Sequence, residues 1–174
     1  MKKLEEYVRN IPDFPEPGII FRDITTLIKD PDGLQMSVDG LCDMLKDVDF
    51  DIVVGPESRG FIFGVPVAYK MRKGFVPVRK KGKLPWKTVS VSYDLEYGSA
   101  EQEMHADAIM PGQKVVIVDD LLATGGTVEA IKKLVRKMGG EVVKMCFVME
   151  LAGLEGRKKN EDTEVAALIT YPGK

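Results

Sequence analysis

The residues best suited to chemistry lie in the stretch VVIVDDLLATGGT, which runs from Val115 to Thr127. Its first four residues are β-branched and predict a buried strand of a parallel sheet. Two carboxylates, Asp119 and Asp120, follow at the carboxyl end of that strand. Ligands of open α/β sheets bind at this end, so the paired acids indicate binding of hydroxyl groups or of a metal ion.

A loop of small residues follows the acids and leads into apolar residues with helical spacing from Val128 to Met138. The loop consists of Ala123, Thr124, Gly125, Gly126 and Thr127. Free N–H groups and the helix dipole make such a loop an anion site. It lacks the lysine of GxxxxGK[ST] and the spacing of GxGxxG. A phosphate on the loop would place an attached sugar over the acids, so the sequence predicts a ribose 5-phosphate site.

These residues carry a family resemblance. VVIVDDLLATGGT resembles the signature with which type I phosphoribosyltransferases bind 5-phospho-α-D-ribose 1-diphosphate (PRPP). PDFPEPGIIFRDIT resembles the base-binding N-terminal arm of the adenine phosphoribosyltransferases, and GPESRGF resembles their pyrophosphate loop. RKKGKLP and SYDLEYG resemble the flexible hood of the same enzymes. The resemblance extends from Ile11 to about Lys159.

The resemblance implies a role for each of these segments. The pyrophosphate would be bound by Arg59 and by the amides of Ser58 and Gly60. Arg79 and Lys80, the other cations at a predicted strand end, are further candidates. Asp119 and Asp120 would bind the ribose hydroxyls, and Mg²⁺ would be held mainly by the substrate, with these two acids as possible ligands.

The adenine site would combine the arm with the hood. Phe21 would stack on the purine, while main-chain groups of Ile20 and Arg22 would bond its edge. Glu96, on the hood next to Tyr97, would take the purine proton or orient the base. A closing hood can desolvate this carboxylate and bring its pKa nearer to neutrality.

The order of the elements predicts an α/β fold, in which helices cover both faces of a parallel twisted sheet. One domain would span residues 1–174, with the arm at about 11–25 and the hood, a two-stranded flap outside the sheet core, at about 80–106. Asp30 and Pro31 predict a helix start. Three prolines and a glycine in residues 11–18 predict no regular structure there, and residues 151–159 predict a surface connection.

Composition narrows the function classes. The chain has 174 residues, 44% of them hydrophobic, and a net charge of −2. Residues 58–93 contain nine Lys or Arg and no Asp or Glu, a local patch that favours a small phosphorylated metabolite over nucleic acid. Apolar runs are too short for a membrane span. Cys42 and Cys146 lack CxxC spacing, so we expect reduced thiols and a cytoplasmic protein.

The resemblance implies an enzyme of purine salvage that converts adenine and PRPP to AMP and diphosphate, and it implies a homodimer. Two alternatives remain open. Hypoxanthine, guanine or xanthine phosphoribosyltransferases share the central motif, but they build the purine site with a C-terminal hood, and ten residues follow Glu164 here. A PRPP-sensing regulator would need a helix-turn-helix or a broad basic face to bind nucleic acid.

Overall fold

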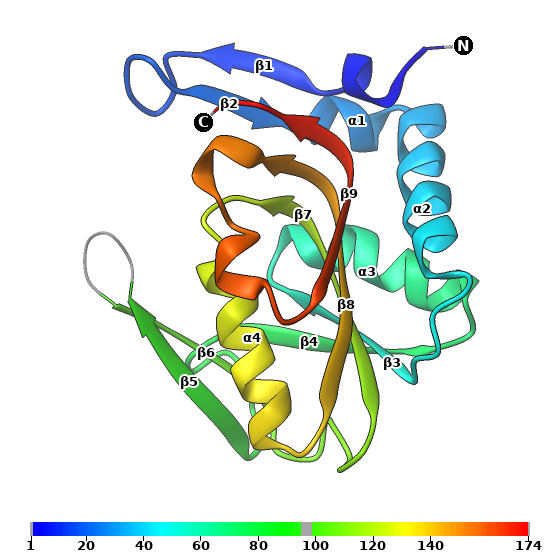
Figure 1. Ribbon diagram of the computed structural model, residues 1–174, viewed down its shortest axis with the longest axis vertical. Helices are drawn as coiled ribbons and strands as arrows, with labels where there is room; N and C mark the ends of the chain where they lie inside the picture. The colour runs from blue at the N-terminus through cyan, green and yellow to red at the C-terminus, as the bar shows by residue number, and fades with distance from the viewer. Residues whose placement is uncertain (1, 95–98, 174) are drawn as a thin grey trace.

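The structure, a computed structural model, describes residues 2–94 and 99–173 (Figure 1). Seven strands form one sheet in the order β5-β6-β4-β3-β7-β8-β9. They are β3 (Ile52–Pro56), β4 (Gly74–Lys80), β5 (Thr88–Asp94), β6 (Ser99–His105), β7 (Lys114–Leu122), β8 (Glu141–Leu151) and β9 (Glu164–Tyr171). A separate hairpin pairs β1 (Arg9–Pro12) with β2 (Ile20–Asp23). The α-helices are α1 (Thr25–Lys29), α2 (Pro31–Leu45), α3 (Arg59–Lys70) and α4 (Gly126–Lys137), and three short 3-10 helices are η1 (Leu4–Tyr7), η2 (Ala152–Leu154) and η3 (Lys158–Asn160).

The predicted α/β fold with a mostly parallel sheet is confirmed. Strands β4, β3, β7, β8 and β9 are parallel neighbours, as expected when helices connect successive strands. Helix α3 connects β3 to β4, and α4 connects β7 to β8. At one edge β6 runs antiparallel to both β4 and β5, so the sheet is mixed.

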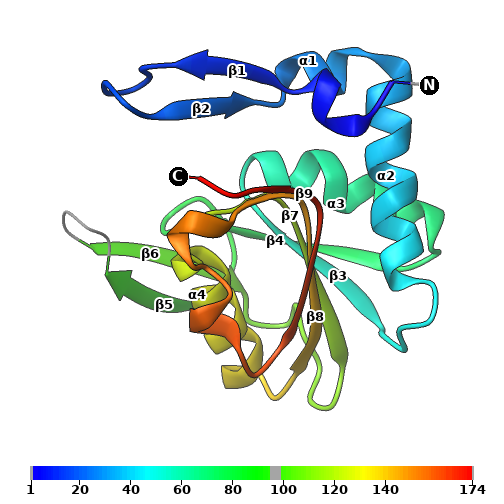
Figure 2. The same ribbon diagram turned by 45° about the horizontal axis from the view of Figure 1, so that its top comes forward.

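The alternation of side chains along β7 divides the core into two layers. Val116 and Val118 pack in a cluster with α2 and α3, whereas Val115 and Ile117 pack in a second cluster with α4. Figure 2 shows α2 and α3 on the opposite side of the sheet from α4. Because both faces of β7 are covered, its apolar run is continuous, and the strand that carries the acids is rigidly held.

Helix α2 begins as the sequence predicts. The side chain of Asp30 accepts hydrogen bonds from the backbone N–H groups of Asp32 and Gly33, and Pro31 occupies the first helical position. The cap satisfies two N–H groups that would otherwise lack a partner. The helix ends at Leu45.

The N-terminal arm has more regular structure than the prolines predict. Ile11 and Pro12 belong to β1 and pair with Phe21 and Ile20 of β2, which corrects the expectation of an irregular segment from residue 11. The hairpin has only two strands, so both are edge strands, where proline is tolerated because not every N–H is needed for pairing. Figure 1 shows the hairpin at the end of the molecule toward which β8 and β9 run.

The predicted two-stranded flap is continuous with the sheet, which corrects its description as separate from the sheet core. Arg79 and Lys80 of β4 pair with Glu103 and Gln102 of β6, and the neighbouring Met104 is fully buried. The alternation of apolar and polar residues in β5 predicts a strand, but nothing local in the sequence shows that β6 pairs with β4. None of the helices in residues 2–94 and 99–173 is long and apolar enough to cross a membrane.

Candidate active site

A cavity of about 230 Å³ lies where β3 and β7 end and α4 begins. Pro56, Glu57 and Arg59 line one side of it, and the continuous stretch 119–128 lines the other. The two acids and the whole small-residue loop predicted from the sequence therefore meet at one cavity. Its position agrees with the rule that ligands of α/β sheets bind at the carboxyl ends of the strands.

The paired acids are almost completely buried. Asp119 is 8% exposed and Asp120 is 3% exposed, and the backbone N–H of Asp120 donates to Asp119 Oδ1 over 2.8 Å. Burial raises the pKa of both carboxyls, and for Asp119 the neighbouring Asp120 charge adds to this effect. Burying carboxyl groups in this way lowers the free energy of unfolding, and carboxyls that a protein retains at such a cost commonly bind a ligand.

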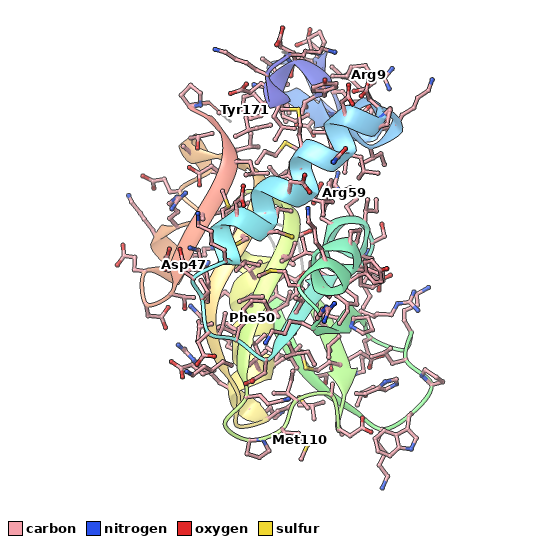
Figure 3. All side chains as sticks on the ribbon, turned by 90° about the vertical axis from the view of Figure 1, so that its right-hand side faces the viewer. Arg9, Asp47, Phe50, Arg59, Met110 and Tyr171 are labelled. Carbon is pink, nitrogen blue, oxygen red and sulfur yellow. The ribbon has the colours of Figure 1, made fainter. Side chains whose placement is uncertain are left out.

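Arg59 offsets part of this cost. Its Nε lies 2.9 Å from Asp120 Oδ2 and opposes the rise in the pKa of that carboxyl. The contact lacks hydrogen-bond geometry, so Asp120 Oδ2 has no hydrogen-bond partner among the described side chains. Arg59 is the first residue of α3 and is labelled in Figure 3. An arginine this close to both the acid and the cavity is available to a second anion.

The loop that precedes α4 has the geometry of an anion site. Gly125 is the N-cap of the helix and has a φ of +79°, a conformation that favours glycine. Its carbonyl accepts the N–H of Glu129, while residues 123–127 all line the cavity. The N-terminus of a helix preceded by residues with small side chains can present free amides to a phosphate.

The remaining predicted pyrophosphate contacts lie next to the cavity. Arg79 Nη2 is 3.4 Å from Glu57 Oε2, and the N–H of Lys80 donates to Glu57 Oε1 over 2.5 Å. The bond from Lys80 is the main reason why the pKa of Glu57 is lowered. Ser58 and Gly60 flank Arg59, and a Cβ on Gly60 would lie 3.1 Å from Asp119 Oδ1. Glu57 was missed from the sequence, where only its place in GPESRGF singles it out.

The predicted adenine contacts do not line this cavity. Ile20 is 40% exposed, Phe21 meets Phe14 edge to face with ring centroids 5.3 Å apart, and the guanidinium of Arg22 lies 4.0 Å from the ring centroid of Tyr171. Figure 3 shows Arg9, at the base of the hairpin, and Tyr171 at the same end of the molecule. The arm is thus attached near the end of β9.

Two hood residues, Glu96 and Tyr97, lie outside the described residues. The strand before them does reach the loop, because a Cβ on Gly126 would lie 3.8 Å from Cδ2 of Tyr93. Tyr93 belongs to β5, so one strand of the hood lies beside the loop of residues 123–127, for which we keep the name phosphate loop after its predicted ligand. Sequence reasoning gave this tyrosine no role.

Most of the segment 151–159 is exposed, as the sequence predicts, but Gly156 within it is buried. A Cβ on Gly156 would lie 2.3 Å from the carbonyl oxygen of Ala123, so the segment packs directly beneath the phosphate loop. Asn160, the next residue after the segment, is completely buried and donates to the carbonyl of Gly125 over 3.3 Å. No local sequence pattern predicts the hydrogen bond between Asn160 and Gly125.

Comparison with known proteins identifies the family. Residues 41–171 match the family model described as the phosphoribosyl transferase domain. A protein of Lachnoclostridium phytofermentans named adenine phosphoribosyltransferase is 64% identical over 174 residues, which are all of both chains. The chain belongs to the adenine phosphoribosyltransferase family.

Solved adenine phosphoribosyltransferases have the same fold. The crystal structure of the enzyme from Thermoanaerobacter pseudethanolicus superimposes with a TM-score of 0.93 at 50% identity, covering 97% of this chain and 100% of that one. The Saccharomyces cerevisiae enzyme, solved with an imino-altritol bisphosphate and adenine, gives a TM-score of 0.88 at 40% identity, covering 95% of this chain and 96% of that one. These matches extend over the arm and the hood as well as the central sheet.

Proposed function

We propose that this protein transfers the phosphoribosyl group of PRPP to adenine, giving AMP and diphosphate. A new bond forms between N9 of adenine and C1′ of the ribose, the bond from C1′ to the diphosphate oxygen breaks, and the N9 proton is removed. The observation that carries the proposal is that a helix N-terminal loop without bulky side chains and two buried carboxylates share one cavity. Full-length similarity to adenine phosphoribosyltransferases supports adenine as the base.

The sugar phosphate would occupy the cavity in one orientation. The amides and hydroxyls of residues 123–127 would bind the 5-phosphate at the positive end of α4. Asp119 and Asp120 would accept hydrogen bonds from the ribose hydroxyls. The transition state of such a transfer has positive charge on the ribose, and an ionised carboxylate beneath the ring would stabilise it.

Arg59 would exchange partners when PRPP binds. Without substrate its guanidinium lies against Asp120, which is 3% exposed. A pyrophosphate carries more charge than one carboxylate and accepts bidentate hydrogen bonds, so it competes effectively for an arginine whose side chain is 44% exposed. The amides of Ser58 and Gly60, with Arg79 and Lys80, would complete the pyrophosphate site.

Mg²⁺ fits this site as an ion bound chiefly by the substrate. Among the described residues no three His, Cys, Asp or Glu side chains gather to hold a metal ion. One or two carboxylates plus substrate phosphates is the usual Mg²⁺ environment, and the buried Asp120 Oδ2 has an ion pair with Arg59 but no hydrogen-bond partner in residues 2–94 and 99–173. When bound, the ion would neutralise charge on the leaving diphosphate.

The base would be held by the arm. Phe21 would stack on adenine, the main chain of Ile20 and Arg22 would bond its edge, and Glu96 of the hood, with Tyr97 beside it, would take or orient the N9 proton. A Glu96→Gln variant tests this last role directly. Full turnover with unchanged substrate binding would remove Glu96 from the mechanism.

The experiment that tests the proposed function is a comparison of bases. The purified protein, with PRPP and Mg²⁺, should form AMP from adenine with a kcat/KM at least about a hundredfold above that for hypoxanthine or guanine. Equal or faster turnover of a 6-oxopurine would assign the chain to that class of substrate. No turnover of any purine, with PRPP binding retained and nucleic acid bound, would favour a regulator.

Three broader proposals concern the whole protein. We expect residues 1–174 to behave as one domain, with the arm at about 11–25 and the hood at about 80–106.

We expect a homodimer, and α3 offers an exposed apolar surface for it, since Val65 is 47% and Tyr69 is 85% exposed. Two free cysteines suit the reducing cytoplasm. Sedimentation of the wild type and of a Tyr69→Glu variant tests the dimer, and a monomeric wild type contradicts it.

A further inference from the structure

A buried polar chain lies behind the phosphate loop. Asn160 is 0% exposed and Lys132, from α4, is 4% exposed. The ammonium of Lys132 donates to Asn160 Oδ1 over 3.2 Å and to Asp162 Oδ1 over 2.6 Å. A fully buried amide and a nearly buried ammonium are costly unless their bonds are satisfied, so this chain requires an explanation.

Lys132 determines which way the Asn160 amide points. A lysine can only donate hydrogen bonds, so the amide oxygen must face Lys132 and the amide nitrogen must face the other side. On that side Nδ2 donates to the carbonyls of Gly125, over 3.3 Å, and Gly156, over 3.1 Å. Both N–H groups of the amide are thus directed at main-chain carbonyls, one of them in the phosphate loop.

The bond to Gly125 acts on the side of the loop that faces the cavity. The carbonyl of Gly125 and the N–H of Gly126 belong to one planar peptide unit and point in opposite directions. Holding the carbonyl toward Asn160, behind the loop, therefore keeps the Gly126 N–H directed away from Asn160. Both glycines line the cavity. The N–H of Glu129 also donates to the Gly125 carbonyl, over 3.0 Å, so Asn160 is a second donor that holds this peptide unit between two flexible glycines.

We propose that Asn160, oriented by Lys132, is a positioning residue that fixes the Gly125–Gly126 peptide for binding of the nucleotide 5-phosphate. The inference rests on the proposed function, because it assigns the loop to that phosphate. Asn160 touches neither the cavity nor the reacting atoms, and its effect is confined to the direction of an amide. It should therefore change the binding of phosphorylated ligands and leave the binding of the free base unaltered.

Two substitutions test the role of Asn160. Asn160→Asp keeps the shape but replaces the donors with a carboxylate oxygen facing two carbonyls, and Asn160→Ser keeps one donor. We expect Asn160→Asp to raise the Kd for ribose 5-phosphate by about tenfold or more, as loss of an outer-shell partner does at other sites, and Asn160→Ser to raise it less. The KM for PRPP should rise in parallel, while kcat at saturating PRPP and the KM for adenine change by less than about threefold.

A matched control separates positioning from general loss of stability. Ser37 is also 0% exposed and also bonds a main-chain carbonyl, that of Gly33, over 2.8 Å, but it lies in α2 and does not line the cavity. Ser37→Ala should lower the denaturation midpoint without changing the Kd for ribose 5-phosphate. Asp162→Asn, at a half-exposed side chain, replaces the charged partner of Lys132 with a neutral acceptor and should raise that Kd by about three- to fivefold.

The outcomes are distinct. If Asn160→Ser and Asp162→Asn bind ribose 5-phosphate within about twofold of the wild type, the positioning role is wrong. If Ser37→Ala weakens ribose 5-phosphate binding as much as Asn160→Ser does, the effect is general and the role is again wrong. Failure of the proposed function would appear in the wild type instead, as ribose 5-phosphate binding without AMP formation from adenine and PRPP.

Discussion

Replacing Gly125 with alanine tests the geometry of the phosphate loop most directly. Gly125 has a φ of +79°, and a Cβ there would lie 2.5 Å from the carbonyl oxygen of Gly156 and 2.9 Å from Nδ2 of Asn160. The left-handed conformation costs alanine about 1–2 kcal/mol. Moving a main-chain carbonyl to make room adds about 1–3 kcal/mol, as overpacking does in cores.

The expected loss of unfolding free energy is therefore about 2–5 kcal/mol, which corresponds to a Tm lower by about 10 °C for a chain of this length. Urea denaturation of the free protein measures the first quantity and calorimetry measures the second. Because the clash displaces the loop, calorimetric titration with ribose 5-phosphate should also show weaker binding.

Gly126→Ala is the matched control. A Cβ on Gly126 would meet its nearest neighbours at 3.8 Å and 4.0 Å, which is ordinary van der Waals contact. This residue begins α4, where alanine is favoured over glycine by up to about 1 kcal/mol. We expect its unfolding free energy to equal or exceed that of the wild type. A Gly125→Ala protein as stable as Gly126→Ala would refute the reasoning.

Three further substitutions separate the parts of the site. Burial, with the adjacent Asp120 charge, raises the pKa of Asp119 in the folded protein, so the ionised carboxylate destabilises the fold at any pH above its unfolded pKa of about 4. Asp119→Asn should therefore raise the Tm at pH 7.5, and this gain should vanish as the pH falls toward about 4. An unchanged Tm at pH 7.5 would contradict this. Arg59→Met removes charge-assisted hydrogen bonds to the pyrophosphate that are worth about 1.5–3 kcal/mol. In steady-state kinetics it should raise the KM for PRPP about 10- to 100-fold and leave the KM for adenine unchanged. Equal effects on both KM values would argue against a pyrophosphate contact. Phe21→Ala should raise the KM for adenine about tenfold because the stacking contact with the base is lost. Calorimetry should show unchanged binding of ribose 5-phosphate. An unaltered KM for adenine would remove Phe21 from the base site.

The central sheet and the cavity could be predicted because their signals are local. The β-branched run before Asp119 favours a strand that is covered on both faces, and Asp30 with Pro31 marks a helix start that the structure reproduces. The acids and the loop are contiguous in sequence, so predicting one strand and one helix was enough to bring them together.

The parts that escaped prediction depend on contacts between distant residues. Asn160 bonds Gly125 across 35 positions, and nothing in its neighbours distinguishes it from a surface asparagine. Glu57 was overlooked because its partner, the N–H of Lys80, lies 23 positions away. The hairpin from Arg9 to Asp23 forms through cross-strand pairing, which a proline-rich sequence conceals. The roles of Phe21 and Glu96 came from the family resemblance and remain predictions.

The hairpin of residues 9–23 is a small sheet of its own, and in the described part of the chain it forms no ladder with the seven-stranded sheet that positions the cavity. Under the proposed function, in which the nucleobase contacts this module and the hood, substitutions in residues 9–23 would change the choice of base without altering the strands of the main sheet. Exchanging that module between relatives would then show how far the hairpin alone decides which base is used.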